Sequence, residues 1–179
     1  MKFVESGLPG CYTIITNDFK DDRGVFFKTF HIGYFKEFGL EVDWKEEYFS
    51  ISNKNVIRGM HFQNPPHDHV KVVTCLSGSV TDVILDLRRN SPMYRSFVKI
   101  SLTADSDCKM VYIPRGCAHG FLSLENDTLL HYKVSSVYSP KHDKGVKWNS
   151  FGFNWGVENP VISERDSLHP PLNEFKSKF

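Results

Sequence analysis

The sequence predicts an all-β fold, a jelly-roll barrel with one short helix and an irregular C-terminal segment. Glycine and proline separate many short runs of β-branched and aromatic residues, and helical periodicity is scarce. Aromatic residues make up 14% of the 179-residue chain, so a core can form without disulfides or metal. Many short strands with regular turns are typical of a sandwich or barrel, and a cupin-like jelly roll (a double-stranded β-helix) has a mouth that can hold a small ligand.

The first third of the chain alternates β-like runs with polar turns. Residues 31–40 hold Phe35 and Phe38 on one helical face, which predicts the short helix. A polar turn is expected at Asp18–Gly24. Strands are expected over residues 11–16, 25–30, 48–52 and 56–62.

The remaining strands follow at similar spacing. Ser77-Gly-Ser79 predicts a hairpin turn, and loops are expected at residues 103–109 and 125–127. From Tyr138 onward the chain is rich in Pro, Asn, Trp and charge, which predicts irregular structure. Strands are expected over residues 70–76, 80–87, 97–102, 110–113, 120–124 and 129–134.

Composition restricts the class of protein. The length and the absence of a linker predict a single domain over residues 1–179. With a net charge of +1 and no basic tract, nucleic acid and membrane are not expected partners. No apolar signal core or membrane-spanning run is present, and the four cysteines show no CxxC or secretory pattern. We therefore expect a cytoplasmic protein with reduced thiols.

The most informative segment is Arg58-Gly-Met-His-Phe-Gln63, followed by Lys71. It places two cations and a candidate base close together in a strand-like region, where a core strand has no use for them. Strict alternation would put Arg58 and His61 on opposite faces of the strand. Both reach one pocket only if the strand bulges, and Gly59 is the natural place for a bulge.

Other candidate residues have ordinary alternatives. His119 emerges from the turn Pro114–Gly116, where it is either a hydrogen-bonding turn histidine or a site residue. Tyr132 shares a strand face with Leu130 and Val134, so it is either core or a proton donor in a pocket.

A metal centre is a rival interpretation. His67-Asp-His69 followed by His119 resembles the histidine set of a metal-binding cupin, and such imidazoles suit Zn, Fe, Ni or Mn. The glutamate that usually follows the first pair is absent, and Lys71 would repel a cation. We therefore expect no metal and no other cofactor.

Taken in order along the chain, these motifs resemble the dTDP-4-dehydrorhamnose 3,5-epimerase family of nucleotide-sugar enzymes. The resemblance spans nearly the whole chain and implies a cupin-like jelly roll, a homodimer and catalysis without metal. It rests on Asp22–Phe27, Val56–Gln63, Lys71, Asp82–Arg88, Ser91-Pro92, Ile113–Phe121, Tyr132-Lys133, Tyr138–Pro140 and Gly145–Trp148.

The resemblance also implies residue roles. His61 falls on the base, Asp166 on the carboxylate that orients it, and Tyr132 on the general acid. A C4 ketone acidifies the hydrogens on C3 and C5, and inversion needs an acid on the face opposite the base. Lys71 is the best cation for the enolate oxygen. Substrate contacts are expected from Arg23, Lys28, Glu46, Tyr48, Arg58, Gln63, His119, Asp143 and Arg165, with Arg23 and Arg58 on the diphosphate.

The base-reading segment departs from the family pattern. Members that contact thymine carry Gln-x-Asn where this chain has Glu46-Glu-Tyr48. A glutamate only accepts hydrogen bonds and matches the N1–H and N2–H₂ donors of guanine. We therefore expect a GDP-linked 4-keto sugar, such as the heptoses of capsule polysaccharides. The alternatives are a metal-binding cupin enzyme and a sugar-nucleotide binding protein without catalytic activity.

Overall fold

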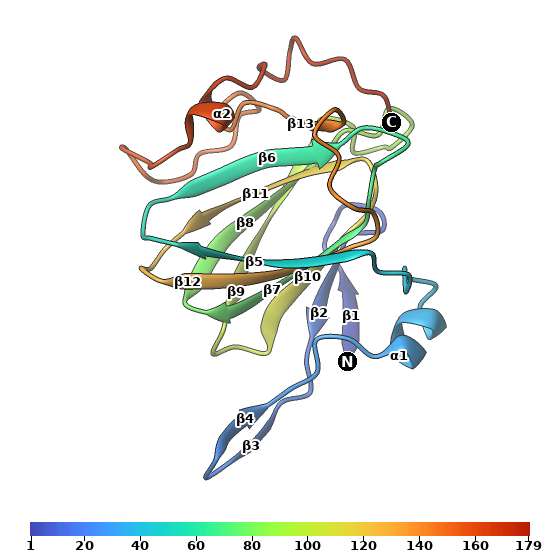
Figure 1. The fold of residues 1–179 in the computed structure, drawn as a ribbon, viewed down its shortest axis with the longest axis vertical. Helices are drawn as coiled ribbons and strands as arrows, with labels where there is room; N and C mark the ends of the chain where they lie inside the picture. The colour runs from blue at the N-terminus through green and yellow to red at the C-terminus, as the bar shows by residue number, and fades with distance from the viewer.

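The computed structural model describes residues 1–179 as two facing antiparallel sheets with a separate two-stranded arm (Figure 1). In spatial order, the six-stranded sheet contains β1 (Lys2–Glu5), β2 (Tyr12–Ile15), β10 (Cys108–Ile113), β7 (Lys71–Ser77), β12 (Thr128–Val134) and β5 (Glu46–Ser52). The five-stranded sheet contains β13 (Asp143–Gly145), β6 (Ile57–Gln63), β11 (Cys117–Ser123), β8 (Ser79–Asp86) and β9 (Phe97–Thr103). The predicted all-β jelly roll is confirmed.

The predicted hairpin at Ser77–Ser79 is wrong in its pairing. The tight turn exists, with Gly78 at φ 73°, but β7 pairs with β10 and β12 whereas β8 pairs with β9 and β11. From β5 to β8, and again from β9 to β13, consecutive strands alternate between the two sheets. A turn signal indicates that the chain reverses direction, and it does not tell which sheet the next strand joins.

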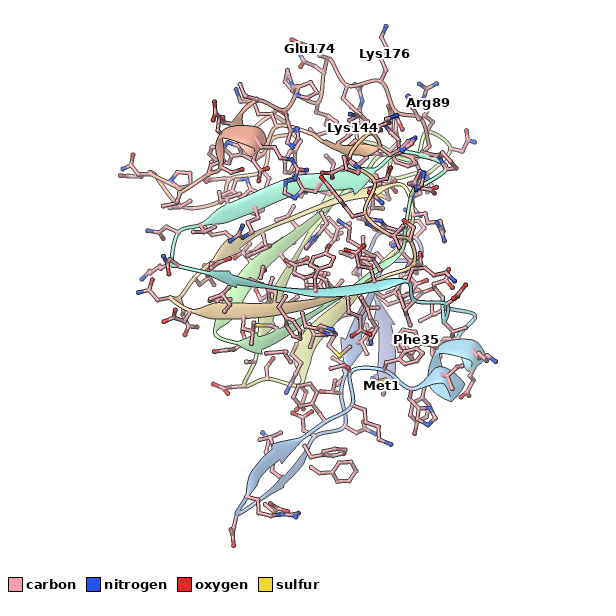
Figure 2. All side chains as sticks on the ribbon, in the orientation of Figure 1. Met1, Phe35, Arg89, Lys144, Glu174 and Lys176 are labelled. Atoms are coloured by element: carbon pink, nitrogen blue, oxygen red, sulfur yellow. The ribbon has the colours of Figure 1, made fainter.

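Three apolar clusters hold the layers together. Val73 and Leu130 of one sheet meet Ile84 and Phe121 of the other, so the first cluster fills the barrel between the sheets. The second lies on the outer face of the five-stranded sheet, where the C-terminal segment packs. The third lies under α1 (Ile32–Glu37), whose Phe35 is completely buried on the side facing the sheets (Figure 2).

The arm replaces a turn and a strand that the sequence predicted. Residues 18–24 were expected to be a turn and 25–30 a strand, whereas β3 (Phe19–Asp21) and β4 (Gly24–Phe26) form a hairpin that projects from the barrel (Figure 1). All residues of both strands are exposed. The rings of Phe19 and Phe26 contact each other across the hairpin, with centroids 6.3 Å apart.

Other differences concern element ends and edges. α1 is shorter than the predicted 31–40, because Gly39 adopts φ 67° just beyond it and ends the helix. The edge strands β1 and β13 were not predicted. The segment after Tyr138 is irregular as expected, apart from β13 and α2 (Glu164–Ser167), and it crosses the outer side of β6 (Figure 1). No helix has the length and apolar character needed to cross a membrane.

Candidate active site

A cavity of about 340 Å³ lies between the two sheets, beside the first apolar cluster. Strands β5, β7 and β12 supply one wall, and β6 and β11 supply the other. Most of the predicted site residues line it, namely Glu46, Tyr48, Arg58, His61, Gln63, Lys71, His119, Tyr132, Asp143 and Arg165. The fold therefore gathers in one place residues that are more than a hundred positions apart in the sequence.

The predicted bulge in β6 brings Arg58 and His61 to the same cavity. Between the pairs His61–His119 and Arg58–Phe121, β6 uses one residue more than β11. Gly59 lies within this stretch at φ 141°, and a Cβ there would be 2.5 Å from the Cα of Gly120. Two strands approach this closely only where both lack a side chain, so the glycine in Arg-Gly-Met-His is a requirement of the site.

His61 is backed by a buried carboxylate. Its Nε2 lies 2.7 Å from Oδ1 of Asp166, while Oδ2 of Asp166 accepts the Gly59 N–H at 3.0 Å. Ser163 caps α2 by accepting the Asp166 N–H at 3.1 Å, which fixes the carboxylate in place. Nδ1 is therefore the ring nitrogen of His61 that is left for a ligand.

The protonation states of His61 and Asp166 suit a role for His61 as a base. Burial lowers the pKa of His61, and the Asp166 carboxylate only partly offsets that effect. Burial alone would raise the pKa of Asp166, but its hydrogen bond to His61 brings that pKa below its usual value. The histidine is thus neutral and the aspartate ionised at neutral pH, so the imidazole can accept a proton.

Tyr132 faces the cavity from the opposite sheet. Its ring stacks on Tyr48 with centroids 4.7 Å apart, and its hydroxyl lies 3.3 Å from Ser50 Oγ. Burial raises the pKa of Tyr132 far above its usual value, so the hydroxyl holds its proton and is available as a donor.

Lys71 is a buried cation beside this pair. Its Nζ donates to the carbonyl oxygen of His61 at 3.4 Å. Burial lowers the pKa of Lys71 to about 8, although Asp143 and Asp82 favour its charged form. The ammonium is therefore largely charged at neutral pH but titrates not far above it.

Asp82 is a site residue that the sequence reasoning missed. It is completely buried on β8, and its Oδ2 lies 2.7 Å from Nε2 of His119, which fixes the orientation of that ring. The signal was present, because two carboxylates, Asp82 and Asp86, stand in the mostly apolar segment Val80–Leu87. A buried carboxylate of this kind needs a partner, and here the partner is a cavity histidine.

The binding candidates divide between the two ends of the cavity. Arg58 lies at one end, held by Ser52 Oγ and the Ile51 carbonyl. Arg165 lies at the other end, paired with Asp143 at 2.6 Å. Gln63, directly opposite Asp143 in the sheet, belongs to this second end.

Gln63 is held by the protein itself. Its Oε1 accepts the Ser139 N–H at 2.5 Å, and its Nε2 lies within hydrogen-bonding distance of the His67 and Val137 carbonyls. The amide therefore shapes the segment Ser136–Ser139, and it has little capacity left for a ligand, contrary to the role expected for it.

Of the two adjacent glutamates, only Glu46 lines the cavity. Its Oε2 accepts the Tyr138 N–H at 2.7 Å. Glu47 points to the other face of the sheet, where its carboxylate binds Lys133 and lies 3.3 Å from His131. The exposed ring of Tyr138, also missed by the sequence reasoning, lines the cavity beside Glu46.

Two predicted binding residues lie outside the cavity of this chain. Arg23 is at the tip of the arm, where its exposed guanidinium pairs with Asp21 at 2.5 Å. Lys28 follows β4 at the base of the arm and does not line the cavity either. The structure therefore shows neither residue at the cavity where the other binding candidates meet.

The histidines of the rival metal interpretation do not come together. His67 stacks on His142, His69 lies beside Gln63, and His119 binds Asp82. The one cluster with three possible ligands is His61, Asp166 and His169, whose ligand atoms lie within 4.8 Å of one another. Since the His61–Asp166 hydrogen bond already occupies two of these groups, the arrangement suits proton transfer better than metal coordination.

Comparison with known proteins identifies one family. Residues 5–174 match the family model described as dTDP-4-dehydrorhamnose 3,5-epimerase. The dTDP-4-dehydrorhamnose 3,5-epimerase of Methanothermobacter thermautotrophicus is 35% identical over 178 residues, which cover 97% of this chain and 95% of the relative.

Solved structures show the same architecture. The Bacillus anthracis dTDP-4-dehydrorhamnose 3,5-epimerase, with TDP and PPi bound, gives a TM-score of 0.91 at 33% identity over 96% of this chain and 99% of its own. The Legionella pneumophila enzyme in complex with dTDP-4-keto-L-rhamnose gives a TM-score of 0.91 at 27% identity, and the match covers 98% of this chain and 94% of that enzyme. This chain belongs to the dTDP-4-dehydrorhamnose 3,5-epimerase family and is an isomerase acting on nucleotide-linked 4-keto sugars.

Proposed function

We propose that this member of the family inverts C3, C5 or both of a nucleotide-diphosphate 4-keto sugar, with His61 as the base and Tyr132 as the acid. One observation carries the proposal: the two groups face one cavity from opposite sheets. His61 takes the proton from carbon, the electron pair moves onto the C4 oxygen, and the Tyr132 hydroxyl returns a proton on the other face. Lys71 stabilises the enolate oxygen, and Asp166 supports the imidazolium.

The order of groups along the cavity suggests how the substrate lies. Glu46 and Tyr138 are at the end where Arg165 pairs with Asp143, whereas Arg58 is at the opposite end beyond His61. We place the nucleotide base beside Glu46, the diphosphate beside Arg165 and the sugar between His61 and Tyr132. Arg58 then contacts the sugar instead of the diphosphate, which revises the role expected from the sequence.

The nucleotide is proposed to be guanine-based. The names of the relatives and the bound TDP in the Bacillus anthracis structure support thymine. The acceptor-only carboxylate of Glu46 in the cavity supports guanine, because it suits adjacent N–H donors. A GDP-linked 4-keto heptose for capsule or another surface polysaccharide is the finer form of this proposal. Tighter binding of dTDP than of GDP to the unmodified protein would contradict it.

A homodimer is also proposed. Phe49 and Ile51 are 62% and 63% exposed on the outer face of the edge strand β5, and the arm exposes Phe19 and Phe26. Apolar surface of this kind is typical of an interface. Light scattering should give twice the mass of the chain, and Phe49→Glu should shift it toward a monomer. A monomeric unmodified protein at micromolar concentration would refute the dimer.

Deuterium exchange tests the reaction. An NDP-4-keto sugar incubated with the protein in D₂O should take up deuterium at C3, C5 or both without added cofactor. NMR assignment of the labelled carbons then tells at which centres a proton is removed and returned. Binding without any exchange would support the alternative, a sugar-nucleotide binding protein without turnover.

A further inference from the structure

The hydroxyl of Tyr132 has one hydrogen-bond partner in the protein, Ser50 of β5. Both side chains line the cavity, and Ser50 Oγ lies 3.3 Å from the Tyr132 hydroxyl. Tyr132 is directly opposite Tyr48 in the sheet, and Ser50 is two positions further along β5, so the contact is a diagonal one that an aromatic side chain can reach. Ser50 therefore contacts the very atom that gives up its proton when Tyr132 serves as the acid.

Proton donation by Tyr132 leaves a negative charge on a buried oxygen. Burial raises the pKa of Tyr132 far above its usual value, because the surroundings disfavour the phenolate. Tyr48 and Asp82 raise this pKa further, whereas the hydrogen bond to Ser50 and the charge of Arg58 lower it. An acid whose anion is so disfavoured gives up its proton slowly unless a donor faces its oxygen.

The other polar groups around Tyr132 do not donate to its oxygen. Arg58 acts through its charge alone, because its Nε donates to Ser52 Oγ at 3.1 Å. The ring of His119 lies 6.2 Å from that of Tyr132, centroid to centroid, and its Nε2 already has a carboxylate partner. Ser50 is thus the group that can donate directly to the Tyr132 oxygen.

We propose that Ser50 is a positioning residue for the acid, and that its O–H donates to the Tyr132 oxygen while the Tyr132 proton moves to carbon. This inference rests on the proposed function for the role of Tyr132. In that step the electron pair of the enolate forms the new C–H bond. The O–H bond of Tyr132 breaks, and its electron pair stays on the phenolate oxygen, which accepts from Ser50. A serine hydroxyl rotates freely, so Ser50 can donate once the Tyr132 hydrogen points to the substrate.

Titration of the side chain at position 132 tests this contact without turnover. A fluorinated tyrosine placed there ionises at lower pH than tyrosine does, and ¹⁹F NMR follows its ionisation. Ser50→Ala should raise the pKa of the fluorinated tyrosine by about one to two units, because a hydrogen bond to a charged oxygen is lost. Ser50→Thr keeps the hydroxyl and should largely restore the original pKa. An unchanged pKa in Ser50→Ala overturns the inference.

Kinetics separate a positioning role from a contact with substrate. The probe is an NDP-4-keto sugar in D₂O, supplied as the dTDP and the GDP derivative. Ser50→Ala should slow inversion by roughly tenfold to a hundredfold with little change in KM, whereas deuterium uptake with retention, which needs only His61, should persist. Added to Tyr132→Phe, Ser50→Ala should change neither rate nor KM further, because Ser50 acts through the Tyr132 oxygen. A further loss in this double variant would make Ser50 a substrate contact and reject the positioning role.

Ser52→Ala is the matched control, because it removes the hydroxyl that holds Arg58 two positions along the same strand. It should weaken substrate binding without reproducing the pKa change at position 132. Equal pKa changes in both serine variants would attribute the effect to repacking of β5 and contradict the inference. The proposed reaction fails separately: if the unmodified protein puts no deuterium into the sugar, the reaction is refuted even where the pKa change depends on Ser50.

Discussion

At the scale of the residue, the site separates a base from an acid by burying both. His61 is kept neutral and oriented by Asp166, while Tyr132 on the other sheet is kept protonated. Burial extends the pH range over which His61 is neutral and Tyr132 is protonated, because it lowers the first pKa and raises the second. Asp82 stands behind His119 in the same way as Asp166 stands behind His61.

Removal of the charge on Asp166 should slow the reaction with little effect on binding. Asp166→Asn can still accept from Gly59 but offers His61 a poorer partner, so the imidazolium loses support. We expect deuterium exchange to fall by about 10²–10⁴-fold, while the dissociation constant of the nucleoside diphosphate changes little. The same loss of exchange without loss of binding is expected for His61→Asn. Undiminished exchange in the latter would place the base elsewhere.

The dependence of kcat/KM on pH should reflect the titration of His61 and Lys71. The pKa of His61 is lowered, so kcat/KM should hold below pH 6.5, where free imidazole would already be protonated. The pKa of Lys71 is about 8, so kcat/KM should fall as the ammonium loses its proton near that pH.

Lys71→Arg identifies the alkaline limb. Arginine keeps its charge throughout this range, so the limb should move to higher pH even if the maximum rate is lower. An alkaline limb at the same pH in the variant would assign it to another group.

At the scale of the element, the bulge in β6 depends on one glycine. Gly59→Ala would put a Cβ 2.5 Å from the backbone of Gly120 at φ 141°, so the strands must move apart. We expect a loss of about 2–4 kcal/mol in unfolding free energy by urea titration. Gly152→Ala is the matched control, because it also has positive φ but meets nothing within 4 Å. Equal losses in both variants would mean that backbone strain alone, without the close approach, explains the effect.

Local sequence patterns predicted the positions of the strands better than they predicted which strands pair with each other. The strand over Val80–Leu87 and the bulge at Gly59 could be predicted from the sequence because each depends on a few neighbouring residues. The arm could not be predicted in this way, because all residues of its two strands are exposed and show no alternation of buried and exposed positions. The pairing of β7 and β8 with different sheets depends on long-range contacts that a turn signal does not contain.

The candidate site was predictable where the motif itself carried the chemistry. His61, Tyr132 and Asp166 were assigned through resemblance; the first two line one cavity, and Asp166 lies 2.7 Å from the His61 ring. His69 was considered only as a metal ligand, because nothing in the sequence shows that Gln63 would hold its ring. Such a contact depends on how the loops before β7 and after β12 pack together.

At the scale of the whole molecule, partly buried histidines that stay neutral make the fold sensitive to acid. Burial lowers the pKa of His61, His69 and His169, whereas in the unfolded chain each would titrate near 6.5. Between these values the unfolded state binds more protons than the folded state. Stability is therefore complete above about pH 6.5 and declines as the pH falls below it.

His69→Phe should flatten this dependence. With a folded pKa of about 2, His69 alone lowers the unfolding free energy by up to about 1.4 kcal/mol for each pH unit below its unfolded pKa. Urea titrations at a series of pH values should therefore show a constant difference between the variant and the unmodified protein above pH 7. Below pH 6 the variant should gain relative stability steadily, down to about pH 4. Parallel stability curves across the whole range would show that His69 takes up protons equally in the folded and unfolded chains, and therefore that burial does not keep its ring neutral.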